Sequence, residues 1–111
     1  MIEYKDFSKI DIRVGTIITA EINEFAKIPA YKLTIDFGDE IGIKTTSAQI
    51  TEEYTTNELI GKQICAVVNF PPKQVAKVMS EVLVLGACKK SNVKLLITDK
   101  KCENGLKVEI V

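Results

Sequence analysis

Residues 69–87 read NFPPKQVAKVMSEVLVLGA, and this stretch is the most informative part of the chain. It begins where one apolar run, residues 64–68, ends, and it enters a second apolar run at Val82–Leu85. Short apolar runs rich in β-branched residues are typical of buried strands, and the prolines and polar residues between them predict a loop. Rigid strands position such a loop while its polar groups remain available, so the stretch predicts a binding site.

Outward from this stretch, the chain carries further strand patterns of alternating apolar and polar residues. Gly15 predicts a bulge or bend in a long first strand. Gly38-Asp39-Glu40 predicts a short hairpin loop, and Asn104-Gly105 predicts a turn near the C-terminus. The runs expected to be strands are residues 12–22, 31–37, 41–45, 62–69, 81–89, 93–98 and 106–110.

One short, broken helix is expected within residues 49–60. Ser47 is a candidate N-cap for its start, Thr55-Thr56-Asn57-Glu58 has the pattern of a capping box, and Gly61 suits the helix exit. Five strands with a short helix between the third and the fourth follow the order of an OB-fold barrel. The sequence therefore predicts an all-β fold with one short helix, built as a five-stranded OB-fold barrel.

The predicted barrel lies within a single domain of residues 1–111, with its core at about residues 8–89. The two C-terminal strands, in residues 90–111, exceed what the barrel requires. They are expected either to cover an edge of the same chain or to pair with a second copy, since both arrangements protect an exposed edge.

The composition argues against several classes of function. The chain has no His and no Cys-x-x-Cys, so neither a zinc site nor His-based acid–base catalysis is expected. No activated nucleophile or pair of carboxylates indicates an enzyme, and no cofactor is expected. Cys65 and Cys88 fall in apolar strand patterns and are interpreted as small buried hydrophobic residues in a reducing cytosol. Without a signal core or a membrane-length apolar run, we expect a cytoplasmic protein with no membrane contact.

The formal net charge is zero, but the charges are unevenly distributed along the chain. Residues 1–60 hold 6 basic and 11 acidic side chains, whereas residues 61–111 hold 9 basic and 4 acidic ones. Either these charges are simply spread over a solvated surface, or the basic C-terminal half forms a face that attracts anions. A sequence pI near 6.3 argues against indiscriminate binding of polyanions.

Several motifs, in order along the chain, resemble the tRNA-binding domain family, an OB-fold module that is free-standing or appended to some aminoacyl-tRNA synthetases. The matching segments are Asp11–Ile17, Ile35–Gly38, Leu59–Lys62 and Asn69–Leu85. Within the family, the chain is most similar to small stand-alone members described as export-related chaperones. That similarity rests on Ile41–Lys44, Ser47–Thr51, Val67–Pro72 and Ser80–Gly86, and it covers nearly the whole chain.

The resemblance implies a homodimer in which N- and C-terminal extensions form much of the interface, and it implies no catalysis. For the tRNA-binding members it implies recognition of tRNA shape, and for the chaperone-like members it implies binding of unfolded or preprotein segments in an apolar groove. The chain departs from the family at Gln74–Lys77, where the usual run is Lys-Met-Arg-Gly and this sequence has neither Arg nor Gly.

In an OB-fold, the loops after the first and fourth strands border the binding surface. Lys73 and Lys77 are therefore the main candidates for contact with phosphate. Lys32 and Lys44 lie on the predicted hairpin, where they either flank the groove or simply face outward. Asn69 and Ser80 bracket the loop and either bind a ligand or satisfy backbone groups of the loop. The full set of candidate binding residues is Lys32, Lys44, Asn69, Phe70, Lys73, Lys77 and Ser80.

Apolar loop residues supply the basis for binding an unfolded segment, if several are exposed together. They are Phe25, Ile28, Phe70, Val75 and Val78. Tyr31 and Phe37 are the only aromatic residues that alternate along one strand, and Phe37 is expected in the core. A base-stacking platform is therefore not expected. Asp11 and Arg13 share a face of the first strand and are interpreted as a structural pair.

Two functions follow from these observations. The first is a noncovalent, chaperone-like binder of unfolded or preprotein segments. The alternative is a tRNA-binding protein that contacts phosphates.

Overall fold

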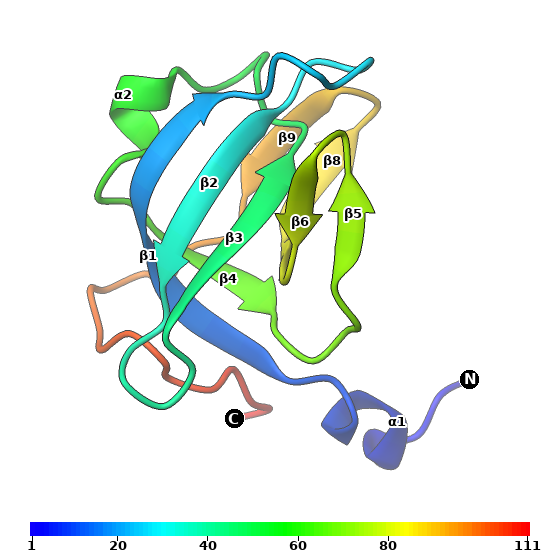
Figure 1. Ribbon diagram of the computed structural model, residues 1–111. Coiled ribbons are helices and arrows are strands. Elements are labelled where there is room, and N and C mark those ends of the chain that lie inside the picture. The colour runs from blue at the N-terminus through cyan, green and yellow to red at the C-terminus, as the bar shows by residue number, and fades with distance from the viewer.

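The computed structural model describes residues 1–111 and confirms the all-β prediction. Two short helices accompany nine strands, which Figure 1 colours along the chain. Neither helix has the length and apolar character needed to cross a membrane. In chain order the elements are α1 (Tyr4–Ser8), β1 (Ile12–Ile22), β2 (Tyr31–Asp36), β3 (Ile43–Ala48), α2 (Thr56–Leu59), β4 (Gln63–Val67), β5 (Lys73–Val75), β6 (Val78–Ser80), β7 (Leu83–Val84), β8 (Gly86–Lys89) and β9 (Asn92–Leu95).

Five antiparallel strands in the order β3-β2-β1-β4-β7 form the sheet that curls into the barrel predicted for an OB-fold. The long strand β1 pairs with β4 through Ile12–Thr16 and with β2 through Thr16–Ile22. The bulge of β1 lies between Ile17 and Thr19, so of the bulge or bend predicted at Gly15 the bulge is wrong. Gly15 instead allows close packing, because a Cβ there would lie 2.7 Å from side-chain atoms of Ile35 and Phe37.

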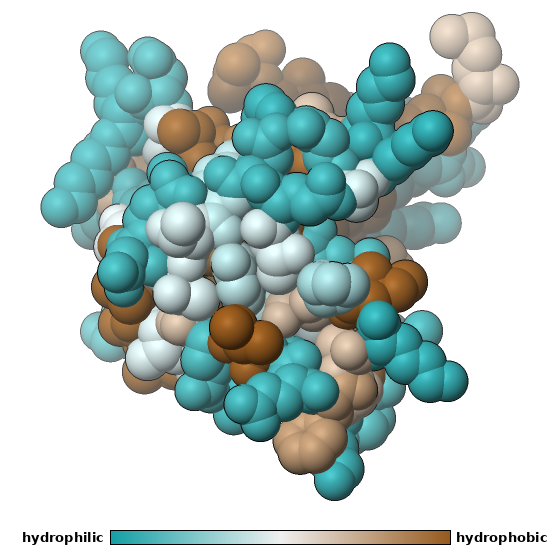
Figure 2. All heavy atoms as spheres, turned by 90° about the horizontal axis from the view of Figure 1, so that it is seen from above, coloured by the Kyte–Doolittle hydropathy of each residue, from teal (hydrophilic) through white to brown (hydrophobic).

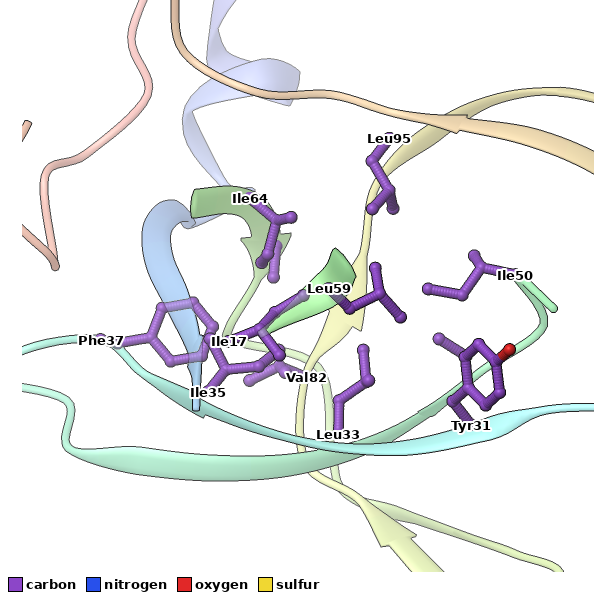
Figure 3. Packing of buried hydrophobic residues seen from close by; sticks show 12 residues of the cluster. Ile17, Tyr31, Leu33, Ile35, Phe37, Ile50, Leu59, Ile64, Val82 and Leu95 are labelled. Atoms are coloured by element: carbon purple, nitrogen blue, oxygen red, sulfur yellow. The ribbon is translucent and has the colours of Figure 1, made fainter. Parts of the chain in front are cut away.

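Alternation along β2 builds the core. Leu33, Ile35 and Phe37 have no exposed surface, whereas the residues between them are only partly buried. Figure 3 shows these side chains meeting Ile17 from β1 and Leu59 from α2. Burial of one such side chain stabilises the fold by about 1.5–3 kcal/mol. The prediction that Phe37 is a core residue is confirmed.

The barrel is closed by bonds between β3 and the segment 80–82. The Glu81 N–H donates to the Thr45 carbonyl (2.8 Å), and the Thr45 N–H donates to Glu81 Oε1 (3.0 Å). The Thr46 Oγ1 hydroxyl donates to the Val82 carbonyl at 2.7 Å. Backbone and side-chain bonds thus replace a regular ladder on this side of the barrel.

The region between β2 and α2 differs in part from the prediction. Strand β3 starts at Ile43 rather than residue 41, because Gly42 has a positive φ of 86° that a strand does not adopt. Ser47 is not an N-cap, since β3 continues through it. The predicted helix is reduced to α2, whose N-cap is Thr55 and whose capping box with Glu58 is confirmed. Helix α1, with a capping box of its own, was not predicted.

The predicted fifth strand, residues 81–89, is divided at Leu85. Strand β7 pairs with β4, whereas β8 leaves the barrel sheet and pairs with β9. Gly86 permits this change of partner, because a Cβ there would lie 2.6 Å from Val93 Cγ1. The predicted strand 93–98 is accordingly shorter, and it ends at Leu95.

Residues 106–110 were predicted as a strand, but they form only an isolated bridge between Lys107 and Arg13. The Asn104-Gly105 turn is confirmed, and the backbone after it bonds to β1. The Val14 N–H donates to the Leu106 carbonyl (2.9 Å), and the Val108 N–H donates to the Ile12 carbonyl (2.8 Å). The C-terminal segment therefore covers an edge of its own chain, one of the two arrangements expected for it.

The cysteines are all free thiols. Cys65 is buried in β4, as predicted, and burial raises the pKa of its thiol, with a smaller contribution from Cys102. The prediction that Cys88 is buried is wrong: it is exposed, because β8 belongs to the outer β8–β9 hairpin rather than to the barrel sheet.

Barrel closure leads to a prediction for Thr46→Val. Thr46 is only 1% exposed, so the variant keeps the shape of the side chain but leaves the buried Val82 carbonyl without this donor. We expect the free energy of unfolding to fall by about 1–3 kcal/mol, measured by urea denaturation. Thr19→Val makes the same atomic change at an exposed position of β1, where water can replace the lost bond to the Thr34 hydroxyl, and should cost less than about 0.5 kcal/mol. Equal stability of the Thr46→Val variant and the wild type would contradict this role.

Candidate functional site

Residues 69–87 contain a hairpin inside the predicted loop. Strands β5 and β6 pair Lys73 with Ser80 and Val75 with Val78, and the hairpin extends along one side of the barrel (Figure 1). Its turn residues, Ala76 and Lys77, have positive φ values of 44° and 68°. Two-residue hairpin turns of this kind favour Gly or Asn, so the absence of the family's usual Gly at Lys77 leaves a strained turn.

Asn69 and Ser80 hold the two ends of this hairpin through backbone groups. Asn69 Oδ1 accepts from the Asp11 N–H (2.9 Å), and its Nδ2 donates to the Lys9 carbonyl (2.8 Å). Ser80 is 5% exposed, and its Oγ accepts from the Ser47 N–H at 3.0 Å. These bonds satisfy backbone groups of other segments rather than of the loop itself, and a ligand-binding role for Asn69 and Ser80 stays a prediction.

The candidate lysines fall into two sets. Lys73 and Lys77 are exposed on the hairpin and form no ion pair with a carboxylate. Lys32 lies on β2, 3.7 Å from Glu21, and Lys44 lies on β3, 4.0 Å from Glu81. The charges of the hairpin lysines are therefore the ones most available to a ligand.

One pocket beside the hairpin is largely apolar, and we call it the proline pocket. Its volume is about 360 Å³, and Phe70 and Leu83 at its edge are 51% and 46% exposed. Large apolar side chains exposed next to a pocket are typical of a surface that binds another apolar group. The lining residues are Phe70, Pro71, Pro72, Lys73, Ser80, Glu81, Val82 and Leu83.

A second pocket lies between the hairpin turn and the β1–β2 loop, and we call it the turn pocket. Its volume is about 350 Å³, and the Nζ of Lys77 lies 4.1 Å from the centre of the Phe25 ring beside it. Glu21, Asn23 and Glu24 of this pocket were not among the candidate binding residues, although the loop after the first strand was expected to border the binding surface. Asn23 directly after a long strand was the available signal. The lining residues are Glu21, Ile22, Asn23, Glu24, Phe25, Lys32, Ala76, Lys77 and Val78.

The apolar loop residues divide between surface and core. Phe25, Ile28 and Phe70 are 60%, 59% and 51% exposed, whereas Val75 is half-buried and Val78 is buried. Figure 2 looks onto the end of the barrel where the β1–β2 loop and the β5–β6 turn lie, and apolar side chains are scattered there among hydrophilic ones. This face is therefore mixed in character.

Tyr31 is buried and donates its hydroxyl hydrogen to the Tyr54 carbonyl (2.7 Å), so it offers no stacking face. A third pocket of about 340 Å³ lies between the end of β3 and the β8–β9 hairpin, but it contains none of the predicted site residues. No group of three or more Cys, Asp or Glu side chains is placed to hold a metal ion.

Arg13 and Asp11 form the structural pair that was predicted. Arg13 Nε lies 2.6 Å from Asp11 Oδ1, and Arg13 Nη1 also donates to Glu40 and to the Gly105 carbonyl. The hydrogen bond to Asp11 raises the pKa of Arg13. Burial lowers this pKa by a smaller amount, and the hydrogen bond to Glu40 raises it further. Arg13 thus fixes β1 to the C-terminal turn.

A small antiparallel barrel of five strands, with a short helix between the third and the fourth, defines a module of the OB-fold class. Residues 12–107 match the family described as "putative tRNA binding domain". The chain belongs to this family.

Two solved structures are similar to this chain over 98% of its length. The structure of chaperone CsaA from Bacillus anthracis is 49% identical to this chain and has a TM-score of 0.93. The match covers 98% of this chain and 99% of that one. The CsaA chaperone protein from Picrophilus torridus is 59% identical, with a TM-score of 0.92 and coverage of 98% of this chain and 100% of that one.

Among curated relatives, a methionine–tRNA ligase from Archaeoglobus fulgidus is 36% identical over 107 residues, which are 96% of this chain but 16% of the ligase. A methionine–tRNA ligase from Porphyromonas gingivalis is 36% identical over 88 residues, 78% of this chain and 12% of the ligase. The chain thus spans less than a fifth of the length of these relatives.

The strained turn leads to a prediction for position 77. Lys77→Gly and Lys77→Ala both remove the cation beside Phe25, but only Gly adopts a φ of 68° without steric cost. We expect the Gly variant to exceed the Ala variant in free energy of unfolding by about 1 kcal/mol, measured by urea denaturation. A more stable Ala variant would show that the turn does not hold this backbone conformation in solution.

Proposed function

We propose that this protein is a non-catalytic, chaperone-like binder that holds exposed apolar segments of unfolded proteins or preproteins in the proline pocket. The observation that carries the proposal is the pocket itself, where the exposed side chains of Phe70 and Leu83 border an apolar hollow beside Pro71 and Pro72. The whole-chain similarity to two structures of chaperone CsaA supports the same function.

Burial of apolar surface supplies the binding free energy in this proposal. Each large apolar side chain of a bound segment that becomes buried contributes about 1.5–3 kcal/mol before ordering costs are subtracted. A few such buried side chains correspond to weak, reversible binding that tolerates many peptide sequences. Because the contacts are apolar, the affinity should change little with salt.

A second candidate function is tRNA binding, which membership of the tRNA-binding domain family favours. The specific observation in its support is the unpaired state of Lys73 and Lys77 on the hairpin. Lysines act as mobile point charges toward phosphate and do not read sequence. In this proposal Asn69 and Ser80 position the hairpin, Lys32 and Lys44 flank it, and Phe70 contacts an apolar part of the ligand.

We further propose that the protein is a cytoplasmic homodimer. Helix α1 and the C-terminal segment line a common small pocket, and apolar side chains around them are exposed. Ile2, Tyr4 and Ile110 are 79%, 70% and 62% exposed, which is a large apolar surface for a monomer to leave in water. A second copy that covers this surface would place two hairpins in one assembly and would raise avidity for a long ligand.

One titration series separates the two candidate functions. The purified protein is titrated with an unfolded apolar peptide and with bulk tRNA at several salt concentrations. Peptide affinity should stay nearly constant, whereas log affinity for tRNA should fall with log salt by about 0.7–0.9 for each phosphate neutralised. Undetectable peptide binding would contradict the first function, and undetectable tRNA binding at low salt would contradict the second.

Two variants assign these ligands to their sites in the same series. Phe70→Ala should weaken peptide binding about tenfold and leave the salt slope for tRNA unchanged. The double variant Lys73→Ala/Lys77→Ala should weaken tRNA binding and flatten that slope, while Lys89→Ala/Lys90→Ala on the β8–β9 turn serves as the matched charge control. The assignment of the lysines is wrong if the hairpin variant binds tRNA as the wild type does.

The dimer proposal predicts a mass in solution of twice the 12.3 kDa chain, measured by sedimentation equilibrium. Tyr4→Asp and Ile110→Asp each place a charge in the proposed interface and should shift the protein toward monomer. Ile28→Asp introduces the same charge on the β1–β2 loop and should leave the mass unchanged. A wild-type mass of a single chain at all accessible concentrations would refute the dimer.

A further inference from the structure

We propose that the turn pocket is a subsite for one unpaired nucleotide of RNA, bound by Asn23 and Phe25 with Lys32 and Lys77 at its phosphate. The inference rests on the second proposed function, tRNA binding, and it specifies which part of the RNA this pocket takes.

Asn23 carries the argument, because it is 7% exposed and has one polar group without a partner. Its backbone N–H donates to the Ala30 carbonyl (3.0 Å), and its carbonyl accepts from the Ala26 N–H (3.2 Å). Its Oδ1 accepts from the Phe25 N–H at 3.2 Å, which fixes the side chain. Only Nδ2 has no hydrogen-bond partner. Buried amide donors are rarely left unpaired, so this group indicates an acceptor that arrives with a ligand.

The surroundings of Asn23 fit a nucleotide. Phe25 is 60% exposed and offers a flat face, on which any base can stack because every base has a π-face. The acceptor edge of a base, a carbonyl oxygen or a ring nitrogen, matches the lone Nδ2 donor. Lys77, whose Nζ lies 4.1 Å from the ring centre, supplies a cation for the phosphate beside that base, and Lys32, which lies 3.7 Å from Glu21, adds a second positive charge in the same pocket.

The pocket suits an unpaired nucleotide better than a duplex or an apolar peptide. Its volume of about 350 Å³ lies at the lower end of small-ligand pockets, about 300–1,000 Å³, and excludes a duplex. An apolar segment would desolvate four charged side chains without compensation. The carboxylates of Glu21 and Glu24 can instead accept from ribose hydroxyls or base amino groups. The four charged residues are Glu21, Glu24, Lys32 and Lys77.

The test uses the full chain, bulk tRNA and fluorescently labelled tetrauridylate at low salt. Asn23→Asp keeps Oδ1 for the Phe25 N–H but replaces the donor by a carboxylate oxygen, and Asn57→Asp makes the same charge change at an exposed position of α2. We expect Asn23→Asp to weaken tetrauridylate binding at least tenfold and Asn57→Asp to change it less than twofold. In the ¹H–¹⁵N spectrum of the wild type, the Asn23 side-chain NH₂ signals should move on addition of tetrauridylate.

These readouts separate the failure of the subsite from the failure of RNA binding. If tRNA binds but the Asn23 NH₂ signals stay in place, the subsite is refuted and RNA binding stands. If the wild type binds no tRNA at low salt, both are refuted. If an apolar peptide, and not tetrauridylate, moves the NH₂ signals, the pocket takes protein instead. The spectrum of the wild type decides the question even where Asn23→Asp fails to fold.

Discussion

The closure of the barrel between β3 and residues 80–82 is the constraint on which the rest of the structure depends. The Glu81 N–H donates to the Thr45 carbonyl, and the Thr45 N–H donates to the Glu81 carboxylate. The buried Thr46 hydroxyl donates to the Val82 carbonyl. Because this side of the barrel has no regular ladder, loss of these bonds would open the barrel between β3 and residues 80–82 and would loosen the hairpin before them, while β7 stays paired with β4. The same residues therefore stabilise the fold and position the candidate site.

The hairpin β5–β6 is held at both ends by atoms distant in sequence. Asn69 binds the backbone of Lys9 and Asp11 at its entry, and Ser80 binds the backbone of Ser47 at its exit. Between these anchors the hairpin borders the proline pocket and the turn pocket. The proline pocket is mainly apolar, with Lys73 and Glu81 as its charged residues, whereas the turn pocket has four charged side chains and an unpartnered amide. This difference in chemistry is the basis for assigning peptide to one and RNA to the other.

The sequence predicted the barrel because its core follows local rules. Leu33, Ile35 and Phe37 alternate strictly along one strand, and the capping box of Thr55 and Glu58 is a local signal. The hairpin within residues 73–80 was missed because its turn uses Ala76 and Lys77 at positive φ, where Gly or Asn is the usual signal.

The sequence placed the candidate residues on the loop after the fourth strand, where the structure has the β5–β6 hairpin, but it did not give their contacts. The two lysines of the hairpin are exposed, yet Asn69 and Ser80 bind backbone groups far along the chain, and such long-range bonds leave no local pattern. Cys88 was predicted as buried because its apolar neighbours resemble a barrel strand. Its exposure depends on Gly86 and on the change of strand partner there.

We propose that the hairpin and its adjoining pockets form the binding surface of this protein. Backbone amide shifts in the ¹H–¹⁵N spectrum during titration with an unfolded apolar peptide locate that surface residue by residue. The largest shifts should cluster in residues 69–83, with β8 and β9 unaffected. Shifts confined to the β8–β9 hairpin or to the chain termini would contradict it.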